Sequence, residues 1–178
     1  MKGVVFTEFL EMTERAIGED AVDDLLDQLA LESGGAYTSV GHYPCAELMR
    51  IVGAVSDLTG VPRDDLHRKL GGWMHGRFVQ QYPRFFRDKT TALDMLVAIE
   101  TEVHAEVRKL YPDAELPRFD TVWTGADSLR MTYRSDRPLV AFCHGLVEAC
   151  IDHFGGRANV VVDRVSAREA VFDVRLER

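Results

Sequence analysis

The hydrophobic period of this chain changes near Pro117, and the change limits the folds that the chain can adopt. Before Pro117, apolar residues recur at helical spacing, which is typical of helices packed on one face. After it, apolar and polar residues alternate in two pairs of segments, as in antiparallel sheets with one solvated face. Strands are expected at residues 119–124, 129–135, 160–165 and 170–176, with a helix at residues 139–154 between the pairs. This order predicts an α+β fold.

The chain before Pro117 reads as a series of helices that end at glycine or proline. The expected helices span about residues 6–17, 19–29, 45–58, 63–80 and 90–110. A length of 178 residues fits one domain with a sizeable core. Within it, the boundary near Val61 divides an N-terminal helical lobe, residues 1–61, from a second lobe, residues 62–178, that holds the sheet. In the last strand pair, the residues expected to face the core are Val162, Val165, Phe172, Val174 and Leu176.

Composition excludes several classes of function. A net charge of −8 disfavours nucleic acid as a partner, because the surface as a whole repels phosphates. The longest nearly apolar run, residues 138–151, contains His144 and Glu148 and is too short to cross a membrane. The N-terminus lacks the apolar core of a signal peptide, so a cytoplasmic protein is expected. Three cysteines without a Cys-x-x-Cys pair predict reduced thiols rather than disulfides or a zinc ribbon.

Three hydrogen-bond donors recur at alternate positions after the change of period. On a strand, Tyr133, Ser135 and Arg137 point to one face, and Leu129 and Met131 continue that face inward. The face therefore passes from apolar side chains to a phenol, a hydroxyl and a guanidinium. Arginine grips a carboxylate with two parallel hydrogen bonds. The pattern indicates a large apolar ligand that carries carboxylates, and heme has that shape.

The Tyr-x-Ser-x-Arg spacing resembles the propionate-binding signature of the heme-nitric oxide/oxygen binding (H-NOX) family, which is related to the heme domain of soluble guanylate cyclase. In that family, the proximal histidine lies on a long helix about thirty residues before the signature, and His104 lies at that distance here. The start Met1-Lys2-Gly3 and the overall length are similar to those of bacterial stand-alone members. The resemblance implies the H-NOX fold, heme b as cofactor, His104 as the iron ligand, and Tyr133, Ser135 and Arg137 as propionate anchors.

From the residues alone, His104 is a weaker candidate. It follows the apolar series Leu93, Leu96 and Val97, so a neutral imidazole would project beside an apolar strip. Glu100 lies four residues earlier and offers an alternative, a zinc pair on one helix face, although no further ligands present themselves. The other histidines are scattered, and most are expected at the surface: His42, His67, His75, His144 and His153. His75 or Met74 remains a candidate for a sixth, weak iron ligand.

The resemblance also implies which residues line the distal side of the heme: Val5, Phe9, Met74, Phe78, Phe142 and Leu146. Oxygen-binding members have a distal tyrosine five residues after the signature arginine, and this chain has Phe142 there. Without a donor, an apolar pocket predicts binding of NO, and of CO in the laboratory, with O₂ excluded or very weak. Val5 and Pro117 lie where relatives bend the heme, so some ring distortion is expected.

The predicted function is a heme-based gas sensor that signals by loss of the iron–His104 bond. The chain carries no catalytic motif, so it is not expected to be an enzyme. The family implies a separate partner, commonly a histidine kinase or a cyclic-di-nucleotide enzyme. The first alternative is a heme-free small-molecule or protein-binding module of the same fold. The second is an enzyme, either a zinc hydrolase using Glu100 and His104 or a peroxidase-like catalyst.

Overall fold

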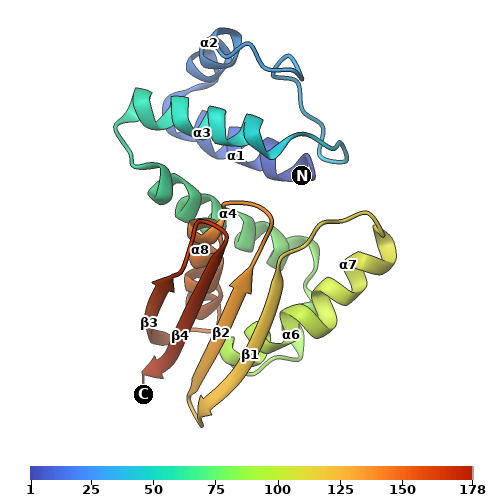
Figure 1. Ribbon diagram of the computed structural model, residues 1–178, viewed down its shortest axis with the longest axis vertical. Coiled ribbons are helices and arrows are strands. Elements are labelled where there is room, and N and C mark those ends of the chain that lie inside the picture. The colour runs from blue at the N-terminus through green and yellow to red at the C-terminus, as the bar shows by residue number, and fades with distance from the viewer. Residues whose placement is uncertain (178) are drawn as a thin grey trace.

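A computed structural model describes residues 1–177, and its α+β architecture confirms the predicted fold class (Figure 1). The helices of the first half are α1 (Val4–Ile17), α2 (Glu19–Gln28), α3 (Cys45–Thr59), α4 (Arg63–Gln81) and α5 (Arg84–Arg87). They are followed by α6 (Ala92–Ala98), η1 (Ile99–Val103), α7 (His104–Leu110), β1 (Arg118–Gly125), β2 (Ser128–Arg134), α8 (Val140–His153), β3 (Arg157–Arg164) and β4 (Glu169–Glu177). Most predicted bounds agree with these within a few residues.

The helices α1, α2 and α3 gather at one end of the molecule, and the sheet lies at the other (Figure 1). Between them runs α4, which packs against α1 and α3 on one side and against α8 on the other. One apolar cluster joins α1, α3 and α4, and its most buried members include Phe6, Phe9 and Ile51. A second cluster lies between the sheet and α6 and α8. The division into two cores follows because each group of amphipathic elements buries its apolar face against its own neighbours.

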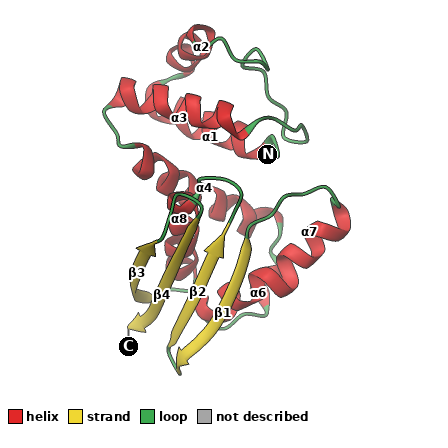
Figure 2. Ribbon diagram, viewed as in Figure 1, coloured by secondary structure: helices red, strands yellow, loops and turns green. Residues whose placement is uncertain are grey.

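Within residues 1–177, the sheet is antiparallel throughout and has the strand order β1-β2-β4-β3. The two strand pairs expected from the sequence therefore join through β2 and β4. Figure 2 shows the outer face of this sheet uncovered by helices, with α8 behind it. The inner face of β2 carries Leu129, Met131 and Tyr133, all buried. Alternation thus predicted the buried face correctly.

One core prediction in the last strand pair is wrong. Phe172 and Val174 are buried, and Val162 and Leu176 pack against the sheet cluster, as expected. Val165, however, is 61% exposed, because β3 ends at Arg164 and residue 165 already belongs to the turn that leads to β4. Alternation cannot place a residue once the strand has ended.

The helices α4 and α8 cross in unusually close contact at two glycines. A Cβ atom on Gly145 would lie 2.0 Å from the carbonyl oxygen of Arg68, and one on Gly71 would lie 2.3 Å from that of Phe142. No other residue fits at such distances, so the backbones touch here. The crossing fixes how α8 presents Phe142 and Leu146 beside α4.

The single helix predicted at residues 90–110 consists of three parts. It begins at a capping box, in which Thr91 and Asp94 exchange hydrogen bonds between side chain and backbone. After α6, the segment η1 is a π-helix, and His104 is the first residue of α7 beyond it. Wide π turns inside helices often occur at functional positions. The apolar period of the sequence does not reveal this turn.

Candidate functional site

His104 lies where helix α7 faces the first strand of the sheet. Its side chain is 12% exposed, and its ring packs 5.6 Å, centroid to centroid, from that of Phe119 on β1. The Nδ1 atom lies 3.1 Å from Oε2 of Glu100. Because an ionised carboxylate only accepts hydrogen bonds, Nδ1 carries the proton and Nε2 keeps its lone pair. Within the described part of the chain, Nε2 makes no hydrogen bond, so it can bind a metal.

The surroundings favour the neutral form of His104 and the ionised form of Glu100. Burial lowers the pKa of His104 below its ordinary value, and the hydrogen bond to Glu100 opposes this effect. Burial by itself raises the pKa of Glu100, but the hydrogen bonds from Arg108 and His104 outweigh it, so that pKa is lowered. A neutral imidazole with its second nitrogen held by a carboxylate is a common form of metal-binding histidine.

The three predicted anchors lie together, although not all on one strand. Tyr133 is on the inner face of β2 and only 2% exposed, and burial raises its pKa to about 12. The strand ends at Arg134, so the expectation that Ser135 and Arg137 continue its face is wrong. Instead the chain turns, and Oγ of Ser135 accepts a hydrogen bond of 3.1 Å from the backbone N–H of Arg137. The neighbouring Ser135 hydroxyl opposes the effect of burial on the pKa of Tyr133.

Arg137 already holds a carboxylate. Its guanidinium donates to the Glu115 carboxylate and, at 2.7 Å, to the carbonyl oxygen of the same residue. The Arg137 side chain is 15% exposed, whereas that of Glu115 is 72% exposed. The arginine is therefore sheltered, whereas the glutamate that it binds lies at the surface. Glu115 was not identified from the sequence, since nothing in its local pattern distinguishes it.

All six residues predicted for the distal pocket belong to, or pack against, the apolar cluster of the N-terminal half: Val5, Phe9, Met74, Phe78, Phe142 and Leu146. They come from α1, α4 and α8, so only the tertiary structure brings them together. Pro117 lies apart from them, directly before β1, and is partly buried.

Three polar side chains that lie beside this cluster already form hydrogen bonds within the protein. The hydroxyl of Tyr37 donates to Glu47 over 2.7 Å, and that of Tyr43 accepts from the backbone N–H of Thr38 over 2.9 Å. The indole of Trp73 donates to Glu8 over 2.6 Å. The Tyr37 hydroxyl and the Trp73 indole therefore have no proton left for a ligand, whereas Nε2 of the buried residues His67 and His75 on α4 has no hydrogen-bond partner.

The two candidates for a sixth ligand face different surroundings. Met74 is 1% exposed and lies within the distal cluster. His75 is also buried, but its ring packs against Phe86 and His153 at centroid distances of 5.4 and 5.6 Å. His67 is buried too, so the expectation that most other histidines lie at the surface is wrong for this residue.

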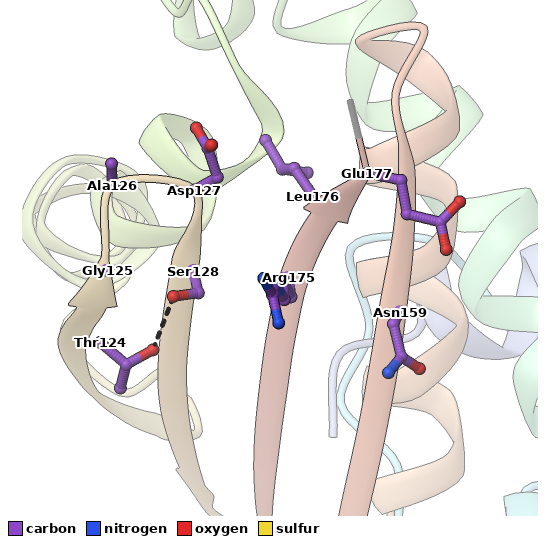
Figure 3. A pocket seen from close by; sticks show the side chains of 9 residues that line it. All are labelled: Thr124, Gly125, Ala126, Asp127, Ser128, Asn159, Arg175, Leu176 and Glu177. Carbon is purple, nitrogen blue, oxygen red and sulfur yellow. Dashed lines mark hydrogen bonds between the residues drawn. The ribbon is translucent and has the colours of Figure 1, made fainter.

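The prominent surface hollows lie away from these residues. One hollow, of about 970 Å³, lies at the β1–β2 turn and is lined by Thr124, Ser128 and Arg175 among others (Figure 3). A second, of about 420 Å³, lies between α5 and α7, lined by Arg84, Glu102 and Lys109 among others. Neither is lined by His104 or the three anchors. Within residues 1–177, no group of three or more His, Cys, Asp and Glu side chains is arranged to hold a metal, so the Glu100–His104 pair has no third ligand of these types.

The comparison with known protein families decides the identity of the chain. A model described as Haem-NO-binding matches residues 2–162. The chain belongs to this family, H-NOX. It is a family of heme-based gas-sensor domains, as the sequence predicted. No curated protein matches the chain.

Solved H-NOX structures show the same fold. The Fe(II) unliganded H-NOX protein from K. algicida is 35% identical with a TM-score of 0.94, and the match covers 100% of this chain and 97% of that one. The H-NOX from Shewanella woodyi in the Fe(II)CO ligation state is 32% identical with a TM-score of 0.84, over 98% and 94% of the two chains. An H-NOX protein from S. oneidensis in the Fe(II)NO ligation state is 22% identical, with a TM-score of 0.89 and full coverage of both chains.

The side chains of this H-NOX chain fit a heme. The lone pair of His104 Nε2 suits iron, and Arg137 already binds a carboxylate, the group that a propionate carries. The apolar cluster supplies a nonpolar face. Among residues 1–177, no helix is long and apolar enough to span a membrane.

Proposed function

We propose that this chain is a nitric oxide sensor whose heme b is bound through His104 and anchored by Tyr133, Ser135 and Arg137. The observation that carries the selectivity for NO is the apolar distal cluster, whose neighbouring hydroxyls are already bonded elsewhere. A buried donor beside bound O₂ adds roughly 1 to 3 kcal/mol, and bound NO gains far less. CO binds as a laboratory ligand, as in the S. woodyi relative, and O₂ binding is very weak.

The signal leaves through helix α7. His104 and the three anchors would hold the heme, and its iron would supply a site that binds NO at the expense of the bond to His104. His104 then no longer holds α7 in place, while Glu100 still contacts β1 through the backbone N–H of Phe119 at 3.3 Å. Tyr111 directly follows α7, and its ring centre lies 4.6 Å from the Lys2 ammonium. A shift of α7 is therefore transmitted to the N-terminal lobe, residues 1–61.

The output belongs to a separate protein. We propose a cytoplasmic histidine kinase or cyclic-di-nucleotide enzyme, regulated by the position of the N-terminal lobe. NO acts on this equilibrium only through its different affinity for the two positions of α7. The chain itself acts as a sensor rather than a catalyst.

An absorption spectrum of the reduced protein tests the function. We expect a five-coordinate iron(II) heme, a clear change with NO and with CO, and no change in air beyond slow oxidation. Protein that stays colourless when expressed with a heme precursor would favour the heme-free binding module instead. A stable oxygen complex would contradict the selectivity for NO.

Arg137 is expected to hold the heme against competition from Glu115. Arg137→Met removes the charged anchor but leaves Tyr133 and Ser135, so we expect heme to dissociate about tenfold faster. Glu115→Gln removes the competing carboxylate, and we expect dissociation to slow by up to about fivefold, the usual limit for an exposed ion pair. Transfer of heme to apomyoglobin measures both rates. Equal rates in the two variants would exclude this role for the pair.

Pro117 is expected to bend the heme, since it is a rigid residue directly before β1. Pro117→Ala should give a flatter ring, and the small side chain of Val5 on the other side should allow the relaxation. Crystal structures or the low-frequency Raman bands of heme distortion measure the change. A variant whose heme is as bent as the parent's would show that another contact is responsible.

A further inference from the structure

The proximal histidine is one end of a chain of three side chains. Nδ1 of His104 lies 3.1 Å from Oε2 of Glu100, and Oε1 of the same carboxylate accepts a hydrogen bond of 2.5 Å from Arg108. The three residues are four apart along η1 and α7, so they lie in one row on the helix surface. The row runs from the sheltered imidazole, 12% exposed, to the guanidinium, 44% exposed.

The carboxylate of Glu100 is held from two elements. Its Oε2 also accepts a hydrogen bond of 3.3 Å from the backbone N–H of Phe119 on β1. The ring of Phe119 in turn packs against the imidazole of His104. Glu100 therefore cannot turn away from His104 without breaking its contacts to both the helix and the sheet. The side chain is only 27% exposed, which limits competition from water.

A hydrogen bond to the second nitrogen of a metal-binding histidine orients the ring and raises its basicity. An anionic acceptor does so more strongly than a neutral one, because charge-assisted hydrogen bonds are about twice as strong. A cation bound to the other oxygen of a carboxylate acceptor draws negative charge away from the histidine. The acceptor then raises the basicity of the histidine less. Glu100 and Arg108 occupy these two positions relative to His104.

We infer that Glu100 is a positioning residue that strengthens the iron–His104 bond, and that Arg108 moderates it through the same carboxylate. This inference rests on the proposed heme ligation by His104. The row then sets how readily NO detaches α7: a stronger acceptor holds the helix longer, and a weaker one releases it sooner. Glu102, two positions from both Glu100 and His104 and paired with Lys89, lies outside the row.

Resonance Raman spectra of the reduced, NO-free protein test the inference through the iron–histidine stretching band. Glu100→Gln keeps the shape but removes the charge, so the band should move to lower wavenumber. Arg108→Met keeps the aliphatic stem but leaves the carboxylate charge uncompensated, so the band should move to higher wavenumber. With NO, loss of the iron–histidine bond should be about tenfold faster in Glu100→Gln than in the parent, the lower end of such effects on metal sites.

Matched controls come from the neighbouring ion pair on the same helix. Lys109 donates to Glu106 over 2.8 Å, and within residues 1–177 neither side chain forms a hydrogen bond or ion pair with His104. Lys109→Met and Glu106→Gln make the same changes of charge and should leave the band unmoved. Shifts in the controls equal to those in the test variants would assign the effect to general charge and overturn the inference.

Each remaining outcome is decisive. Two test variants that shift the band in the same direction, or not at all, overturn the inference, because a merely structural role gives no opposite signs. If Glu100→Gln fails to hold heme, Arg108→Met decides alone, since it leaves the contact between Glu100 and His104 in place. If the parent shows no iron–histidine band although its iron(II) heme is five-coordinate, ligation by His104 has failed, and with it the proposed function.

Discussion

Replacing His104 with glycine is expected to separate heme binding from signalling. Without added imidazole, the variant lacks its proposed protein ligand to iron, and we expect heme affinity to fall at least about 100-fold. Removing a residue that only hydrogen-bonds to a metal ligand already lowers metal affinity by up to about 100-fold. With free imidazole, the space left by the side chain is refilled and heme is retained. The helix α7 is then no longer tied to the iron, so the variant should resemble the NO-bound parent permanently.

Amide hydrogen exchange measures this expected state without knowledge of the partner. Exchange in α7 and near Lys2 of the imidazole-loaded variant should match that of the NO-bound parent, and adding NO should change it no further. His153→Gly is a suitable control, because His153 is exposed and is the last residue of α8. A His104→Gly protein with the exchange pattern of the unliganded parent would refute release of α7 as the signal.

The second large effect is expected from a single hydroxyl in the distal cluster. We expect Phe142→Tyr to bind O₂, which the parent protein is proposed to exclude. Phe142 is partly buried and packs against the apolar cluster, where a phenol has few competing acceptors. A buried hydrogen bond contributes about 1 to 3 kcal/mol, which corresponds to a gain in O₂ affinity between about 5-fold and 150-fold. Binding of NO should change little.

Spectra of the reduced variant in air, and the rate at which CO displaces O₂, measure the gain. Phe154→Tyr is the matched control, because Phe154 directly follows α8 but packs against the sheet cluster. This control should bind O₂ as poorly as the parent. If Phe142→Tyr also excludes O₂ while it still binds NO, the missing donor does not explain the selectivity of the pocket.

The sequence by itself determined the elements and their order. Helical spacing before Pro117 and alternation after it depend on local geometry, so the strands and helices were predicted within a few residues. The buried face of β2, with Leu129, Met131 and Tyr133, follows from the same alternation. The Tyr-x-Ser-x-Arg spacing and the position of His104 were sufficient to indicate the family. Both depend only on distances along the chain, which the sequence gives directly.

The details of the site required the tertiary structure. Period-two reasoning placed Ser135 and Arg137 on a strand that in fact ends at Arg134. The π turn before His104, which leaves the apolar period unchanged, was also not foreseen. Glu100 was visible as a neighbour of His104, but its contacts with Arg108 and Phe119 were not.

Only the tertiary structure decided three further features. These are the pairing of β2 with β4, the ion pair between Arg137 and Glu115, and the convergence of α1, α4 and α8 at the distal cluster. Local periodicity reports which side of an element is apolar. It carries no information on which distant element covers that side, because that choice depends on packing between segments that the sequence separates by tens of residues.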